Sequence, residues 1–229
     1  MISSIKGHNI VTRCINRHSV VLDLGANKGE FARKLFDKTG AKILSVEPFV
    51  DNFNRILALD GGKKFNVAVS DVSRNYYLVL NDNSESNYLT DIEPVGRQYS
   101  VVEGVTFASI IEQNNIDRLS LLKMDIEGTE IRVLRTISRS FLQKINQITI
   151  EFHDFLGDGS VSKEDVKQTC SYLRQNGFSV IKFSPRSFKD VLFLNKMDFK
   201  KSDILKIRIF YRAKYLIALV FSKLFNGDL

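Results

Sequence analysis

The chain has 229 residues, of which 44% are hydrophobic, and its 33 Lys and Arg exceed its 26 Asp and Glu to give a formal net charge of +7. This composition excludes a collagen-like or low-complexity chain, and two Cys far apart in sequence exclude a disulfide-built scaffold. The first twenty residues lack the apolar run of a signal peptide, so we expect a cytoplasmic protein.

Short β-rich runs alternate with longer segments of helical periodicity from residue 19 to residue 195. That order is typical of a parallel sheet covered by helices on both faces. We expect strands at 19–25, 41–48, 65–71, 119–125 and 147–154, and then an antiparallel closing pair at 178–184 and 190–195. We expect helices at 27–38, 51–59, 106–114, 128–137 and 162–177. The prediction is an α/β fold with a doubly wound, Rossmann-like sheet of seven strands, mostly parallel with an antiparallel closing strand.

The region between the third and fourth predicted strands departs from this alternation. Residues 75–80 predict an extra β segment. Residues 81–97 are too rich in Asn, Ser and Asp to be core, and we interpret them as a lid or substrate loop. Thr106 is expected to cap the helix that follows.

The turn after the first strand reads Asp23-Leu24-Gly25-Ala26-Asn27-Lys28-Gly29. Gly25 and Gly29 allow a tight backbone turn and the close approach of a ligand to the helix N-terminus. A dinucleotide fingerprint would have glycine in place of Asn27, so pyrophosphate binding is disfavoured. Asp23 at the strand end and this open turn suit a ligand that carries an amine, although an ordinary strand-turn-helix is the alternative.

Two acidic residues end the next two predicted strands. Glu47 lies 24 positions after Asp23 in the sequence. At this position in a doubly wound sheet, a carboxylate can accept both hydroxyl hydrogens of a ribose. Asp71 ends the third strand, where it can contact an adenine amino group, although VSDVS also makes an ordinary polar turn.

The fourth strand ends in Lys123-Met124-Asp125-Ile126-Glu127-Gly128-Thr129-Glu130. Three carboxylates at the start of a helix can be explained by the helix dipole without any function. Asp125 nevertheless faces the same crevice as Gly25 and Glu47, because ligands bind at the carboxyl ends of parallel strands. We therefore favour a functional role for this cluster.

The fifth strand ends in Glu151-Phe152-His153-Asp154. Glu151 and His153 share one face of the strand by its two-residue period, so both can point at the crevice. His153 is a candidate general base, and a structural histidine is the alternative.

The segments VLDLGANKGEFA, SVEP, VAVSD, LLKMDIEGTE and ITIEFHD resemble those of the FkbM-family methyltransferases in order and spacing, from about residue 19 to residue 195. The resemblance implies a class I, S-adenosylmethionine-dependent enzyme that methylates a hydroxyl oxygen, often on sugars or glycan-modified products. It implies the cofactor more strongly than the acceptor, because members with one signature serve different acceptors.

On this interpretation, S-adenosylmethionine lies over the carboxyl ends of the first two strands. Gly25, Asn27 and Gly29 shape its methionine side, Asp23 orients the amine, and Glu47 holds the ribose, with Asp71 at the adenine and Asp125 as a further cofactor-binding residue. A hydroxyl nucleophile must be aligned with the methyl group and needs a base. We expect His153, helped by Asp125, to be that base, with Glu127 and Glu151 orienting the acceptor. These residues do not require a metal ion, although Asp125 with Glu127 could ligate magnesium.

Other functional classes fit less well. A nicotinamide-dependent or nucleotide-sugar oxidoreductase would need the Gly-x-Gly-x-x-Gly turn and a Tyr-x-x-x-Lys pair, which the sequence lacks. A non-catalytic binding module should have lost one of Gly25, Gly29, Glu47 and Asp125. Residues 200–229 hold seven basic and two acidic residues, which leaves 26 and 24 in the rest, so we expect no nucleic-acid partner.

We divide the chain into a methyltransferase domain, residues 1–199, and a basic, apolar tail, residues 200–229. The tail begins with a strand-like alternation but continues as YLIALVFSKLF, so we expect it to be helical. It either packs on its own domain or in a homo-oligomer, or lies at the inner membrane face, where Lys and Arg contact anionic lipid. The membrane alternative would suit a lipid-linked glycan acceptor.

Overall fold

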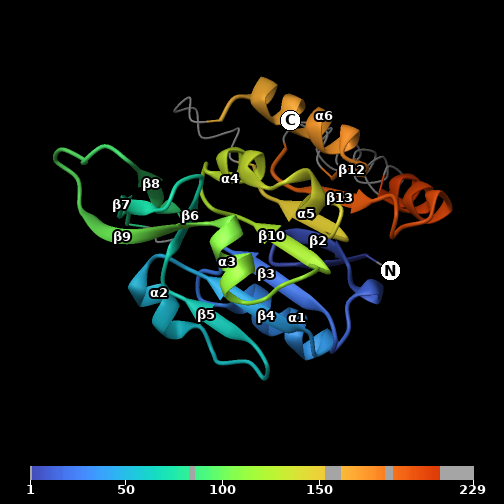
Figure 1. The fold of residues 1–229 in the computed structure, drawn as a ribbon, viewed down its shortest axis with the longest axis horizontal. Helices are drawn as coiled ribbons and strands as arrows, with labels where there is room; N and C mark the ends of the chain where they lie inside the picture. The colour runs from blue at the N-terminus through green and yellow to red at the C-terminus, as the bar shows by residue number, and fades with distance from the viewer. Residues whose placement is uncertain (1, 83–85, 153–160, 184–187, 212–229) are drawn as a thin grey trace, which may run out of the picture.

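The computed structural model describes residues 2–82, 86–152, 161–183 and 188–211 (Figure 1). Its central sheet has seven strands in the order β12 (Phe178–Lys182), β13 (Val191–Asn195), β11 (Gln147–Ile150), β10 (Leu121–Met124), β3 (Val20–Leu24), β4 (Lys42–Val46) and β5 (Lys63–Phe65). The strands from β11 to β5 are parallel, and β13 is antiparallel to both of its neighbours. The predicted α/β fold with an antiparallel closing strand is confirmed.

Helices flank this sheet (Figure 1). They are α1 (Glu30–Thr39), α2 (Val50–Arg55), α3 (Phe107–Gln113), α4 (Glu130–Thr136), α5 (Arg139–Leu142) and α6 (Lys163–Gln175), with a 3₁₀ turn at Thr12–Cys14. The predicted cap is confirmed, because the Thr106 hydroxyl accepts the Ser109 N–H at the start of α3. The Ser162 hydroxyl likewise accepts the Asp165 N–H at the start of α6. These side chains stabilise backbone groups that have no partner inside a helix.

The strand side chains alternate between two apolar cores. Val21 and Leu121 pair in register and pack with Phe31 and Leu35 of α1. Their neighbours, including Leu22, pack with α3, α4 and α6 on the opposite face. Because both faces are covered, the strands are continuous apolar runs, which is the pattern expected of a buried parallel sheet.

The predicted third strand, 65–71, is wrong as a single element. Its first residue ends β5 of the main sheet, whereas β6 (Ala68–Ser70) belongs to a second sheet. Asn66 marks the division, because its side-chain amide donates hydrogen bonds to the carbonyls of Glu47 and Pro48 at 2.9 and 3.0 Å and holds the chain at the bend. The second sheet has the order β6, β9 (Tyr99–Thr106), β7 (Arg74–Val79) and β8 (Tyr88–Thr90).

This second sheet extends to one side of the body (Figure 1). The extra β segment predicted at 75–80 corresponds to β7, but β9 was not predicted and β8 lies inside the stretch that we interpreted as a loop. Long-range pairing with β7 decides these strands, and a local pattern cannot reveal that pairing.

The sequence analysis also missed an N-terminal hairpin of β1 (Ile2–Ile5) and β2 (His8–Val11). Its turn contains Lys6 and Gly7, both with positive φ. The hairpin is fastened to the main sheet by Gln147, whose side chain bonds both the N–H and the carbonyl of Val11, at 2.9 and 3.1 Å. Val11 ends β2 and Gln147 begins β11, so His8, at the start of β2, lies beside Thr149, nearer the carboxyl end of β11.

Residues 201–211 form a helix, red in Figure 1, where the sequence has a strand-like alternation; the helix agrees with the helical tail that we expected as a whole. Phe199 and Ile204 are buried in a third apolar cluster with Leu192 and Leu194 of β13. The remainder of the predicted tail lies outside the described residues. No helix within the described ranges is long and apolar enough to cross a membrane.

Candidate functional site

A cavity of about 680 Å³ opens at the carboxyl ends of β3, β4, β10 and β11. Small-molecule sites in proteins commonly occupy about 300–1,000 Å³. Gly25, Asn27 and Glu47 line one half of the cavity, and Asp125 and Glu151 line the other. Residues that were predicted from four separate strands therefore meet in one place.

At Gly25, the first residue of the turn after β3, the backbone conformation and the surrounding space accept only glycine. Gly25 has a φ of +74°, and a Cβ atom there would lie 1.7 Å from the carbonyl oxygen of Asp125. The Gly25 and Ala26 N–H groups both donate to the carbonyl of Val46, at 3.0 and 2.9 Å. The ends of three neighbouring strands are thus held together by backbone contacts, as expected where a ligand approaches closely.

Glu47 is held rigidly in the same half of the cavity. Its Oε2 accepts the N–H of Asn27 at 2.8 Å, and its Oε1 accepts the N–H of Phe49 at 2.9 Å. Burial raises the pKa of the Glu47 carboxyl above its usual value, although these two N–H donors oppose the rise. Each oxygen keeps a second lone pair with which it can accept a hydroxyl hydrogen.

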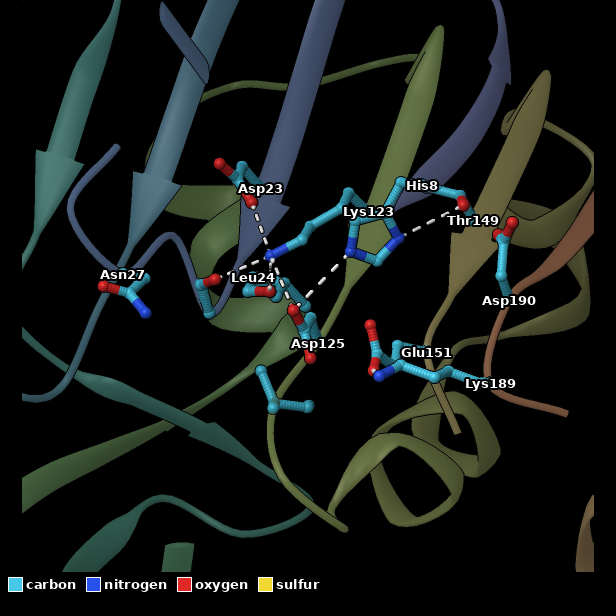
Figure 2. Close-up of polar contacts among 12 residues, drawn as sticks. His8, Asp23, Leu24, Asn27, Lys123, Asp125, Thr149, Glu151, Lys189 and Asp190 are labelled. Atoms are coloured by element: carbon cyan, nitrogen blue, oxygen red, sulfur yellow. Dashed lines mark hydrogen bonds and ion pairs between the residues drawn. The ribbon is translucent and has the colours of Figure 1, made fainter. Parts of the chain in front are cut away.

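Lys123 is buried at the junction of the two halves (Figure 2). Its Nζ lies 2.6 Å from the carbonyl oxygen of Gly25, 3.2 Å from Asp23 Oδ1 and 3.7 Å from Asp125 Oδ2. Burial works against the charged form, but the carboxylates of Asp23 and Asp125 hold the pKa of Lys123 above its ordinary value. The sequence analysis gave Lys123 no role, although a lysine within the apolar strand LLKM was a usable signal.

Asp23 does not have the direct role that we predicted for it. Its carboxylate is fully buried, pairs with Lys123, and is not among the described residues that line the cavity. Lys123 reaches across from β10 and lies between Asp23 and the ligand space. Gly29 also lies outside the lining; with a φ of +76° it starts α1, and a Cβ there would lie 3.1 Å from Ile56.

The three carboxylates after β10 divide into two roles. Asp125 and Glu127 line the cavity, and Glu127 has a positive φ of 51°. Glu130 is fully buried and accepts the N–H groups of Ile126 and Gly128 at 3.1 Å each. Glu130 thus stabilises the loop that presents Asp125 and Glu127.

His8 is the residue of this half that the sequence analysis missed. It is 1% exposed, with Nε2 at 3.5 Å from Asp125 Oδ2 and Nδ1 at 3.4 Å from the Thr149 hydroxyl (Figure 2). Its ring also contacts the edge of Phe31, with centroids 5.7 Å apart. No local pattern marks His8, because the hairpin brings it to the site from far away in sequence.

Glu151 and Lys189 form the outer edge of the acidic half, and Asp190, the next residue in the chain, is not among the described residues that line the cavity. Lys189 Nζ lies 3.3 Å from the Glu151 carboxylate. Asn9 donates hydrogen bonds to Asp190, and burial raises the pKa of Asp190 to about 6. His153, the predicted base, lies outside the described residues, so its role stays a prediction.

The methyltransferase FkbM domain matches residues 23–180. The chain belongs to the FkbM methyltransferase family. It is an S-adenosylmethionine-dependent methyltransferase with the class I fold, which confirms the predicted cofactor and excludes the oxidoreductase alternative. No curated protein matches the sequence at a significant level.

Solved structures similar to this methyltransferase include an rRNA methylase from Streptococcus thermophilus, with 11% identity over 80% of this chain and 90% of that chain and a TM-score of 0.48. A fibrillarin/Nop5p complex matches with 17% identity over 78% and 72% and a TM-score of 0.45. Aeropyrum pernix fibrillarin bound to S-adenosyl-L-methionine matches with 13% identity over 79% and 66% and a TM-score of 0.44. At these identities the likeness concerns the fold alone.

The residues of the first half of the cavity fit S-adenosylmethionine. Gly25 leaves the space that a side chain would fill, and Glu47 offers acceptors for ribose hydroxyls. The buried Asn27 Oδ1 has no hydrogen-bond partner within the described part of the methyltransferase, so it can accept from an ammonium group. Lys123 can pair with a carboxylate.

The predicted adenine contact of Asp71 is not supported by its position. Asp71 directly follows β6 of the second sheet, pairs with Arg132 at 2.8 Å, and is absent from the described cavity lining. The Arg132 guanidinium and the Ser70 hydroxyl hold the pKa of Asp71 below its usual value, although burial opposes them. Val67, Ala68 and Val69 line that part of the cavity instead.

Proposed function

We propose that this methyltransferase acts on a hydroxyl oxygen of a sugar or glycan-type acceptor. The observation that carries the proposal is the acidic half of the cavity, which is lined by Asp125, Glu127 and Glu151. Several carboxylates can accept hydrogen bonds from several hydroxyls at once, which suits a polyol. The same charges repel the phosphates of a nucleic acid.

S-adenosylmethionine supplies an electrophilic methyl group when it is bound. Glu47, Asn27 and Lys123 hold the ligand, and the acidic half aligns the acceptor oxygen with the methyl carbon. A hydroxyl that accepts this methyl group would lose its proton, and a base of the protein would take that proton. We propose His153, helped by Asp125, as that base, with Glu127 and Glu151 orienting the acceptor.

The acceptor class is tested with purified full-length protein and cofactor carrying a deuterated methyl group. Nucleotide sugars, lipid-linked oligosaccharides and total RNA are offered separately, and products are analysed by mass spectrometry. We expect labelled methyl ethers in the sugar or oligosaccharide samples. Label found in RNA alone would overturn the proposal.

The base assignment has a separate test. His153→Ala should lower turnover by about 10²–10⁴ while leaving cofactor affinity unchanged, because a general base acts only in the transfer step. His18→Ala is the matched control, since His18 is exposed and contacts Arg17. Full activity of His153→Ala would show that another group takes the proton.

We also propose that residues 200–229 contact an anionic membrane surface at the inner face. In the described part of this tail, Leu205, Ile209 and Phe210 are exposed next to the exposed Lys201 and Lys206. Apolar side chains beside basic ones suit the boundary between lipid headgroups and acyl chains. Self-association of the chain remains a prediction, which light scattering would test.

The membrane proposal is tested by co-sedimentation with anionic vesicles. A chain truncated at residue 198 would lose the buried Phe199 and Ile204, so surface substitutions are the cleaner variant. Leu205→Gln, Ile209→Gln and Phe210→Gln together should abolish binding. Ile92→Gln with Val95→Gln is the control, because both side chains are exposed elsewhere on the surface. Parent protein that stays in the supernatant at low salt would overturn the proposal.

A further inference from the structure

We propose that His8, Asp125 and Glu151 form a binding site for one divalent cation at the acceptor side of the cavity. The three side chains come from β2 and from the segments that follow β10 and β11. One ligand atom of each lies within 4.8 Å of the others. Figure 2 shows His8 and Asp125 in contact, with Glu151 turned to the same space.

The distances leave room for an ion. Divalent cations bind nitrogen and oxygen ligands at about 2.0–2.2 Å, so two ligands of one ion lie about 3 to 4.3 Å apart. His8 Nε2 and Asp125 Oδ2, at 3.5 Å, already satisfy this range. Glu151 offers an oxygen within 4.8 Å of both, so a shift of its side chain toward them would complete the set.

His8 is the observation that separates this site from an ordinary acidic cluster. Its Nε2 is buried, points at the Asp125 carboxylate, and has no hydrogen-bond partner in the described ranges. When Nδ1 carries the hydrogen and donates it to Thr149, Nε2 presents a lone pair to a carboxylate oxygen. Two acceptors that face each other repel, and an ion between them removes the repulsion. A histidine that ligates a metal usually donates its other N–H in this way.

The local charge also favours a cation. Asp23, Asp125 and Glu151 are three carboxylates, and the buried Lys123 neutralises one of them through contacts with Asp23 and Asp125. Lys189 pairs with Glu151, but its side chain is 61% exposed and can turn to solvent at little cost. With Lys189 displaced, the remaining two charges match a divalent ion.

The ligand types narrow the choice of metal. One imidazole with two carboxylates suits Mn²⁺ or Zn²⁺ better than Mg²⁺, which prefers oxygen ligands alone. The described residues supply three protein ligands, so further positions on the ion can be taken by acceptor oxygens. An ion there would lower the pKa of a coordinated hydroxyl, as metals do for bound water. This catalytic role rests on the proposed function, whereas binding of the ion does not.

The site is tested by titrating the full-length protein with Mn²⁺ alone, followed by electron paramagnetic resonance. We expect one bound ion per chain and a pulsed-resonance coupling to an imidazole nitrogen. His8→Ala should abolish that coupling, and His8→Ala and Glu151→Gln should each weaken Mn²⁺ binding by more than about tenfold. Glu151→Gln keeps the shape of the side chain, so it tests the site even if His8→Ala fails to fold.

Lysine variants separate a metal site from a simple ion pair. Lys189→Ala should tighten Mn²⁺ binding, because it removes a competing ammonium group from Glu151. Lys28→Ala, which removes the same charge elsewhere on the cavity lining, should change the affinity little. Cofactor titration checks that each variant is folded.

Several results would overturn the cation site. They are no Mn²⁺ binding at millimolar concentration, unchanged affinity in Glu151→Gln, or no imidazole coupling in the parent protein. An ion pair between a protonated His8 and Asp125 would give the first result. Protein that binds Mn²⁺ yet methylates only RNA would leave the cation site intact and reject the proposed acceptor.

Discussion

The two halves of the cavity are built in different ways. The cofactor half consists of the turns that follow β3 and β4, where Gly25, Asn27 and Glu47 are held mainly by backbone hydrogen bonds and close packing. The acidic half is assembled from side chains of three distant segments, among them His8 and Glu151. The cofactor half is therefore determined locally, while the acidic half depends on how remote segments pack.

Lys123 links the two halves, so its removal should have the largest effect. Lys123→Met would leave the fully buried Asp23 carboxylate without its cation, which typically costs about 3–5 kcal/mol of unfolding free energy. Urea denaturation measures this loss. Adding Asp23→Asn should restore most of it, because no buried charge then remains. If Lys123→Met alone were as stable as the parent, another group would have to compensate the buried charge of Asp23.

Gly25→Ala should damage both halves at once. The new Cβ would meet the Asp125 carbonyl, and the φ of +74° is unfavourable for alanine, so we expect a loss of about 2–4 kcal/mol in unfolding free energy. Cofactor affinity should fall as well, since the turn must move. Gly96→Ala is the control, because Gly96 also has a positive φ but a Cβ there meets nothing within 4 Å. Equal effects of the two substitutions would contradict the role of close packing.

Glu47→Ala should act on the cofactor half alone. Loss of its charge-assisted contacts, worth about 1.5–3 kcal/mol, should weaken S-adenosylmethionine binding by roughly ten- to more than a hundredfold. Calorimetry with an analogue that lacks both ribose hydroxyls sharpens the test. The parent should prefer the natural cofactor, while Glu47→Ala should bind both equally. A preference that survives in the variant would assign the ribose to another residue.

Asp190→Asn should give a smaller, pH-dependent effect at the edge of the acidic half. Burial raises the pKa of Asp190 to about 6, so the folded protein holds this proton more tightly than the unfolded chain. Its contribution to the unfolding free energy therefore falls as the pH rises from about 4 to about 6, by roughly 1–3 kcal/mol.

The variant removes that dependence. Asp190→Asn should be more stable than the parent at pH 7 and no more stable at pH 4, as measured by thermal unfolding. Asp117→Asn is the control, because the exposed Asp117 carboxyl pairs with Lys144 and its pKa is lowered. If both variants changed the pH dependence of stability equally, the effect could not be assigned to the buried Asp190 carboxyl.

The periodicity of the sequence was enough to predict the central sheet apart from β5, most of its helices and the position of Glu47. These features depend on local physics: apolar runs form buried strands, and a carboxylate at a strand end follows from chain order. The second sheet was not predictable in the same way, since the bend at Asn66 depends on Glu47, 19 residues away, and β6 pairs with β9 in the register Ala68 to Gly104.

By itself, the sequence determined the α/β fold, the glycine turn and the acidic residues of the crevice, because each rests on neighbours along the chain. Only the tertiary structure decided that Asp23 is buried behind Lys123, that Asp71 points to Arg132, and that His8 joins Asp125 and Glu151. The reason is physical: where a charged side chain points depends on the partners that packing brings within a few ångströms, and those partners lie far away in the sequence.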